Sequence, residues 1–244
     1  MLRTCRARRG LVATLASLAL AAGVVTGSGA LGAGAAHAGT DPVRPVPIAA
    51  TDMPSADAGV VRGRTARTAL YAAMRQLWAQ HVHWTYSTVE AFFHNPDALQ
   101  ATQDRLLRNQ HDIGDAIAPY YGRAAADRLT DLLLTHIEDS GPVLQALKDG
   151  DAAALKKAMA VWYANAKDIA DFLSTANPEF WPRSVTEPAL KTHITQTAAY
   201  GTDLFRADYT KAITDFDAAE AHMAELADFL SKGIIAQFPG RFTG

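Results

Sequence analysis

The sequence ADFLS stands at residues 170–174 and again at residues 227–231, and this repetition decides the fold. The sequence THI recurs over the same interval, at 135–137 and at 192–194. Self-similarity at a fixed interval of this size is typical of a chain built from several copies of one supersecondary unit. A fainter copy precedes these two. We therefore predict three units, which cover residues 65–118, 123–176 and 187–233.

Each unit reads as two helices joined by a turn. Leu129, Leu133 and His136, for example, follow one another at intervals of four and three residues, which places them on one face of an α-helix. Turn-forming residues interrupt this pattern at 95–97, 119–122, 149–151, 177–178 and 239–240. Strand-type alternation is absent. The prediction is an all-α fold of three antiparallel helical hairpins, six helices in all, loosely analogous to ferritin-like and haemerythrin-like bundles.

Two arrangements of the hairpins fit this pattern, a four-helix bundle with an extra hairpin and a pseudo-threefold assembly of six helices. We expect the fifth helix to begin near Pro188 and the sixth to be capped by Asp208. The repeat also carries three acids that fall about 120° away from the core face of their helices. We expect these acids to form salt bridges between hairpins; they are Asp115, Asp171 and Asp228.

Residues 1–38 have the composition of a secretory signal peptide. Four arginines precede an apolar run from Leu11 to Val25, and Ala36-His37-Ala38 offers a small-x-small cleavage site. The pair Arg8-Arg9 also resembles a twin-arginine export signal. The single cysteine of the chain, Cys5, lies in this segment, so the mature protein has no thiol ligand, nucleophile or disulfide. We therefore predict a secreted or extracytoplasmic protein.

Residues 39–62 contain four prolines and little apolar periodicity, which favours a flexible tether before a single domain at 63–240. Four of the 23 basic residues and none of the 25 acidic residues lie in the signal, so the mature chain is acidic. An acidic exported chain is a poor match for nucleic acid or for an anionic membrane surface. No apolar run in the mature chain approaches the length of about 20 residues that a membrane span requires. The sequence names no protein partner.

The repeat predicts a polar layer inside the bundle. His81, His136 and His193 occupy equivalent positions, each at the same distance before the turn of its hairpin. A residue about equally far beyond the turn lies at the same height in an antiparallel hairpin. The residues at those heights have apolar neighbours on their own helices and are also equivalent to one another; they are Asn109, Asn165 and His222.

Two interpretations of this layer remain open. In the first, the histidines converge on a transition metal such as Fe, Zn or Cu, since neutral imidazole suits these ions. The ligands would then be His81, His136, His193 and His222. In the second, the layer is purely structural, because buried polar groups must be paired. The supporting polar residues in either case are Asn109, Asn165, Thr85, Ser140 and Thr197.

Several motifs resemble those of a poorly characterised family of bacterial α-helical bundle proteins. They are QHVHWT at 80–85, RLLRN at 105–109, PYYG at 119–122, WYAN at 162–165, NP at 177–178 and QFP at 237–239. The family pattern has Glu where this chain has Gln80, and Arg where it has Tyr86. The resemblance implies a helical bundle and brings no established activity.

These observations lead to a functional prediction with two rivals. We predict an exported helical-bundle protein that binds a transition metal through its buried histidines, in metal handling or in metal-assisted redox chemistry. The first rival is a non-catalytic interaction or structural module of the cell envelope with a purely structural polar layer. The second is a metal-free enzyme that uses one histidine as a general base, for which the sequence offers no partner carboxylate. The sequence holds no glycine-rich phosphate loop and no nucleophile elbow, and it does not decide whether the protein is an enzyme.

Overall fold

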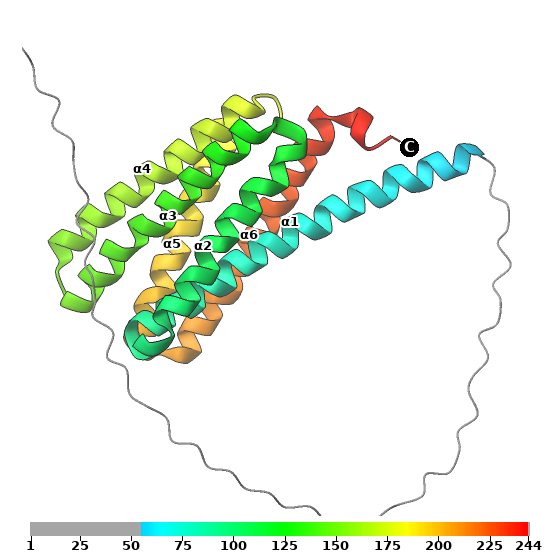
Figure 1. Ribbon diagram of the computed structural model, residues 1–244. Helices are drawn as coiled ribbons and strands as arrows, with labels where there is room; N and C mark the ends of the chain where they lie inside the picture. The colour runs from blue at the N-terminus through cyan, green and yellow to red at the C-terminus, as the bar shows by residue number, and fades with distance from the viewer. Residues whose placement is uncertain (1–54, 244) are drawn as a thin grey trace, which may run out of the picture. The chain divides into compact units, whose positions relative to one another are not determined.

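The computed structural model describes residues 55–243, with side chains from residue 59 onward (Figure 1). It contains six α-helices and a short 3-10 helix, namely α1 Ser55–His94, α2 Pro96–Tyr121, α3 Arg123–Asp149, α4 Ala152–Ala176, α5 Arg183–Phe205, α6 Tyr209–Gln237 and η1 Pro239–Arg241. No β-strand occurs in this part of the chain, which confirms the all-α prediction. The predicted signal peptide at 1–38 and residues 39–54 of the predicted tether lie outside the described residues.

The six helices close into a ring. Each helix packs against the next one in the sequence, and α1 also packs against α6. In addition, α1, α3 and α5 contact one another, so they form the inner layer of the bundle, and α2, α4 and α6 lie outside them. Of the two arrangements that the repeat allows, the described residues adopt the pseudo-threefold one. No helix of this bundle has the length and apolar character needed to cross a bilayer.

Two helix boundaries differ from those expected. Helix α1 begins at Ser55, so residues 55–62 are helical and do not belong to the predicted tether. The reason is that Pro54 is the last proline before Pro96, and the residues that follow it are compatible with a helix. Helix α5 begins at Arg183 instead of near Pro188, because a proline close to the helix start removes only one backbone hydrogen bond.

Acidic side chains cap two helices and link the hairpins. Asp151 accepts hydrogen bonds from two backbone amides at the start of α4, and the equivalent Asp208 accepts one from Lys211 at the start of α6.

The three repeated acids form the expected salt bridges between hairpins, at 2.7 Å for Asp115–Arg123, 2.9 Å for Asp171–Arg183 and 2.6 Å for Asp228–Arg75. The last of these joins α6 to α1 and closes the ring.

Candidate metal centre

Three histidines lie at the centre of the inner layer. His81 is on α1, His136 on α3 and His193 on α5, and each is at most 3% exposed. Three residues before each histidine stands a buried apolar residue of the core, namely Trp78, Leu133 and Leu190. The apolar face of each inner helix therefore turns the histidine toward the pseudo-threefold axis, at the same height in all three hairpins.

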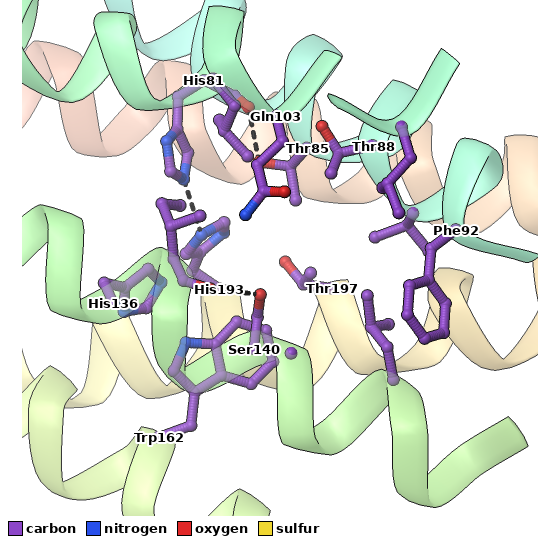
Figure 2. Close-up of a pocket in the computed structure, with 16 residues that line it drawn as sticks. His81, Thr85, Thr88, Phe92, Gln103, His136, Ser140, Trp162, His193 and Thr197 are labelled. Atoms are coloured by element: carbon purple, nitrogen blue, oxygen red, sulfur yellow. Dashed lines mark hydrogen bonds between the residues drawn. The ribbon is translucent and has the colours of Figure 1, made fainter. Parts of the chain in front are cut away.

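The three rings converge on one point. One nitrogen from each ring can be chosen so that all three lie within 4.8 Å of one another. The Nε2 atoms of His81 and His193 are 3.3 Å apart, and the ring of His136 lies 5.8 Å from that of His193 by their centroids (Figure 2). The layer that the repeat predicts thus exists as a compact cluster of three imidazoles.

The other members of the predicted layer lie on the outer helices, farther from the bundle axis than the three histidines. The side chain of each of these residues donates a hydrogen bond to the backbone carbonyl that stands four residues before the histidine of the same hairpin. The bonds are Asn109 Nδ2 to Leu77 O at 3.1 Å, Asn165 Nδ2 to Leu132 O at 3.0 Å, and His222 Nε2 to Ala189 O at 2.9 Å. His222 is therefore not part of the cluster, and the predicted set of four histidine ligands is reduced to three.

Asn165 determines the tautomer of His136. Because its amide nitrogen donates to Leu132 O, its Oδ1 faces His136 Nδ1 at 2.9 Å. An oxygen can only accept, so the proton of the neutral ring sits on Nδ1 and Nε2 keeps its lone pair. A second ring nitrogen that is hydrogen bonded to an oxygen is the usual arrangement for a histidine that ligates a metal.

Gln110 contacts His81 with the opposite polarity, because its amide nitrogen donates to the ring, and the sequence reasoning missed this residue. Its Nε2 lies 3.3 Å from His81 Nδ1 and donates to Leu106 O at 2.8 Å, whereas its Oε1 is buried with no partner among the described residues. The signal was present in the sequence, because Gln110 has Leu106 and Ile113 as apolar neighbours at −4 and +3. The sequence-based prediction assigns that face to Asn109 alone.

The third ring is held differently. His193 Nδ1 is buried and finds no hydrogen-bond partner within the described part of the chain. In the third hairpin His222 occupies the place of the asparagine, so no amide oxygen is available there. The cluster is therefore incompletely paired by protein groups alone.

Burial keeps the three imidazoles neutral. Loss of hydration lowers the pKa of His81 to about 3, with repulsion from His136 as the second cause. The same desolvation lowers the pKa of His136 to about 4, and burial together with the neighbouring histidines lowers that of His193 well below its usual range. Neutral rings with free lone pairs are the form that ligates metals.

A cavity of about 190 Å³ borders the cluster on one side (Figure 2). On the opposite side the histidines rest on the main apolar core, which includes Met74, Trp78 and Leu129. The cavity is lined by the three histidines, by apolar side chains and by a few uncharged polar groups. The lining residues are His81, Thr85, Thr88, Val89, Phe92, Leu99, Gln103, Leu106, His136, Ile137, Ser140, Gly141, Leu144, Trp162, His193 and Thr197.

The predicted hydroxyl residues form part of this cavity wall one turn beyond the histidines. Thr85 donates to His81 O at 2.7 Å and Ser140 donates to Ile137 O at 2.6 Å, so neither hydroxyl bonds an imidazole. Thr197 Oγ1 is buried and makes no hydrogen bond of regular geometry with the described residues. In Figure 2 this hydroxyl and the amide of Gln103 point into the cavity.

The donor set of this centre is three neutral nitrogens. Among the described residues, the cavity lining contains no carboxylate, lysine or arginine. Three histidine ligands with a fourth position open to a cavity are the arrangement of catalytic zinc sites, whereas closed structural sites use four protein ligands.

Comparison with protein-family models, with curated proteins and with solved structures found no match to this chain. The site must therefore be interpreted from its own geometry.

Proposed function

We propose that this protein binds one transition-metal ion through His81, His136 and His193, and that the ion performs chemistry on a molecule held in the adjoining cavity. The observation that carries the proposal is the convergence of three buried imidazoles, one from each hairpin, next to an open volume. Metal-assisted catalysis fits this arrangement better than metal handling does, because a carrier requires an ion that is easily released, and redox chemistry requires iron or copper because zinc has a single oxidation state. Iron, zinc and copper are the ions that suit the donor set.

The spacing of the rings supports this reading. Two nitrogens that each lie about 2.05 Å from a tetrahedral ion are separated by about 3.3 Å. The Nε2 atoms of His81 and His193 are 3.3 Å apart. The ligand nitrogen of His136 lies within 4.8 Å of the other two, so a small shift of this ring is enough to bring all three nitrogens to one ion.

The structural interpretation of the layer pairs the facing imidazoles without an ion. A single proton between His81 Nε2 and His193 Nε2 satisfies two of the facing nitrogens. It leaves His193 Nδ1 and Gln110 Oε1 buried without partners. An unsatisfied buried polar group costs about 1–3 kcal/mol. An ion bound by the two Nε2 atoms leaves the same two atoms unpaired, so the pairing does not separate the interpretations, and the open cavity beside the cluster is what favours the metal.

Metal analysis tests the proposal. Protein purified from its native host without chelator should contain close to one equivalent of iron, zinc or copper, and chelation should lower its melting temperature. His136→Ala should abolish both the metal content and the effect of the chelator. His111→Ala, which replaces an exposed histidine on α2, should change neither.

The structural alternative predicts another result. Protein from the host would then hold no stoichiometric metal, and zinc, copper or ferrous iron added to the chelated protein would not raise its melting temperature. That outcome would exclude the proposed function. His136→Ala would still destabilise the protein, by about 1–3 kcal/mol, because Asn165 would lose its partner.

The proposal includes export, which rests on the sequence of residues 1–38. Cleavage after Ala38 leaves Gly39 as the first residue of the mature protein. Amino-terminal sequencing of the protein recovered from the extracytoplasmic fraction of its host tests this part, and a start at Met1 would refute it.

A further inference from the structure

The cavity beside the three histidines differs in character from one end to the other. At the histidine end, the hydroxyl of Thr197 and the amide of Gln103 point into the open volume (Figure 2). At the opposite end lie Phe92, near the end of α1, and Leu99, close to the turn between α1 and α2. A rise of about 1.5 Å per residue places Phe92 about 16 Å along the helix from the histidine layer.

The size of the cavity limits the molecule that it can hold. Its volume is about 190 Å³. A cavity of about 150 Å³ lined by leucine, isoleucine and phenylalanine accommodates benzene, which has six carbons. The cavity therefore suits a molecule of about eight non-hydrogen atoms, well below the size of a nucleotide or a sugar chain.

The charge at the histidine end of the cavity indicates which chemical group of a bound molecule would face the ion. Three neutral imidazoles leave the full charge of a divalent ion uncompensated, and no acidic side chain lines the described cavity. A buried positive charge is stabilised by a counter-ion. The hydroxyl of Thr197 interacts with Tyr200 without a hydrogen bond of regular geometry, and the amide of Gln103 projects nearby, so two donors are placed to bind an oxygen of an anionic head. The end at Phe92 and Leu99 offers only hydrocarbon contacts.

The cavity opens toward the surface at Gly141, a position of the inner helix α3 that has no side chain. Gly141 is exposed and lines the cavity, and a Cβ built on it would meet nothing within 4 Å. Around it, Gln103, Ser140 and Leu144 are only partly buried. A small molecule can therefore reach the histidines from the surface between α2 and α3.

We propose that this cavity binds a small monocarboxylate with an apolar body of about five to seven carbons. Its head would be directed at the ion, Gln103 and Thr197, and its tail would extend along the cavity toward the end lined by Phe92 and Leu99. The inference rests on the proposed function, because the ion supplies the charge that selects an anion.

Calorimetric titration of zinc-loaded protein with hexanoate tests the proposal. Hexanoate should bind with 1:1 stoichiometry, and acetate should bind about 100-fold more weakly, because it lacks four methylenes that the cavity would bury. Hexan-1-ol, which has a similar tail without the charge, should bind at least tenfold more weakly than hexanoate. Equal affinity for hexanoate and acetate, or for hexanoate and hexan-1-ol, would overturn the proposal.

Variants of α2 locate the binding site. Leu99→Trp should fill the apolar end and abolish hexanoate binding, and Gln103→Leu should weaken it about tenfold by removing one donor to the carboxylate. Ala101→Trp, which adds the same ring to an exposed position of α2, should leave hexanoate affinity unchanged. Unchanged affinity in Leu99→Trp would overturn the proposal.

Zinc affinity, measured before any carboxylate is added, separates the two levels of inference. Leu99→Trp and Gln103→Leu should bind zinc as the unmodified protein does, since neither residue belongs to the cluster. Zinc binding without hexanoate binding would overturn the carboxylate proposal and leave the metal site standing. Failure to bind zinc, copper or ferrous iron would overturn both.

Discussion

Mild acid should destabilise the metal-free protein far more steeply than an ordinary helical bundle. The three clustered histidines have native pKa values well below 6.5, because burial disfavours their charged form. The unfolded chain therefore binds more protons than the native protein does between pH 6.5 and about 4. Stability is fully present above pH 6.5 and is lost as the pH falls toward the native pKa values.

The magnitude follows from the number of histidines. Each contributes a slope of up to about 1.4 kcal/mol per pH unit where only the unfolded form is protonated. Between pH 6 and pH 5, the three together should remove about 4 kcal/mol from the free energy of unfolding. A domain is stable by about 5–15 kcal/mol in total, so this loss is large. The salt-bridged carboxylates, whose pKa values are lowered, affect stability mainly below this window.

Urea unfolding of the chelated protein, followed by circular dichroism at a series of pH values, measures this slope. His136→Gln should reduce the slope by about one third, whereas His111→Gln, at an exposed site, should leave it unchanged. A loss of about 1 kcal/mol or less between pH 6 and pH 5 would refute the reasoning, because it would mean that the cluster accepts protons in the native state.

Three further predictions concern single contacts. Asn165→Leu should weaken metal binding by about 10–100-fold, measured by competition with a chelator, because one ligand loses the hydrogen bond that orients it. Gly233→Ala should destabilise the protein by about 1–3 kcal/mol in urea, since the new methyl group would collide with the Trp181 indole. Arg75→Ala removes the exposed salt bridge to Asp228 and should lower stability only slightly in the same assay, less than Gly233→Ala does.

The comparison of sequence and structure shows what counting residues can predict. Height along a hairpin follows from the distance to its turn, and for this reason Asn109, Asn165 and His222 each contact the backbone next to the histidine of their own hairpin. Distance from the bundle axis does not follow from that count. His222 therefore lies at the predicted height but outside the cluster of three histidines, because its helix belongs to the outer layer.

Contacts between hairpins were less accessible to sequence reasoning. The cavity is bounded by residues of α1, α2, α3, α4 and α5, and its existence depends on how these helices pack. The sequence pattern of each helix predicts that Val89 and Leu106 face the interior. It does not predict whether such a side chain packs against another side chain or borders a cavity. Gln110 was missed for a related reason, since one buried polar residue had already been assigned to its helix face.

The equivalence of the three hairpins has a consequence for the origin of the centre. One hairpin, assembled as a symmetric trimer, would place three histidines on the axis by itself, so duplication and fusion of a single ancestral hairpin gene is a direct route to this bundle. Fusion then releases each copy from the symmetry. Five residues past the histidine, the copies now carry Tyr86, Gly141 and Ala198. The side chain of Tyr86 packs against Tyr200 and Phe216, whereas Gly141 has no side chain and leaves the equivalent space unoccupied. Divergence at one position among the three copies is therefore enough to give the histidine cluster an opening on one side.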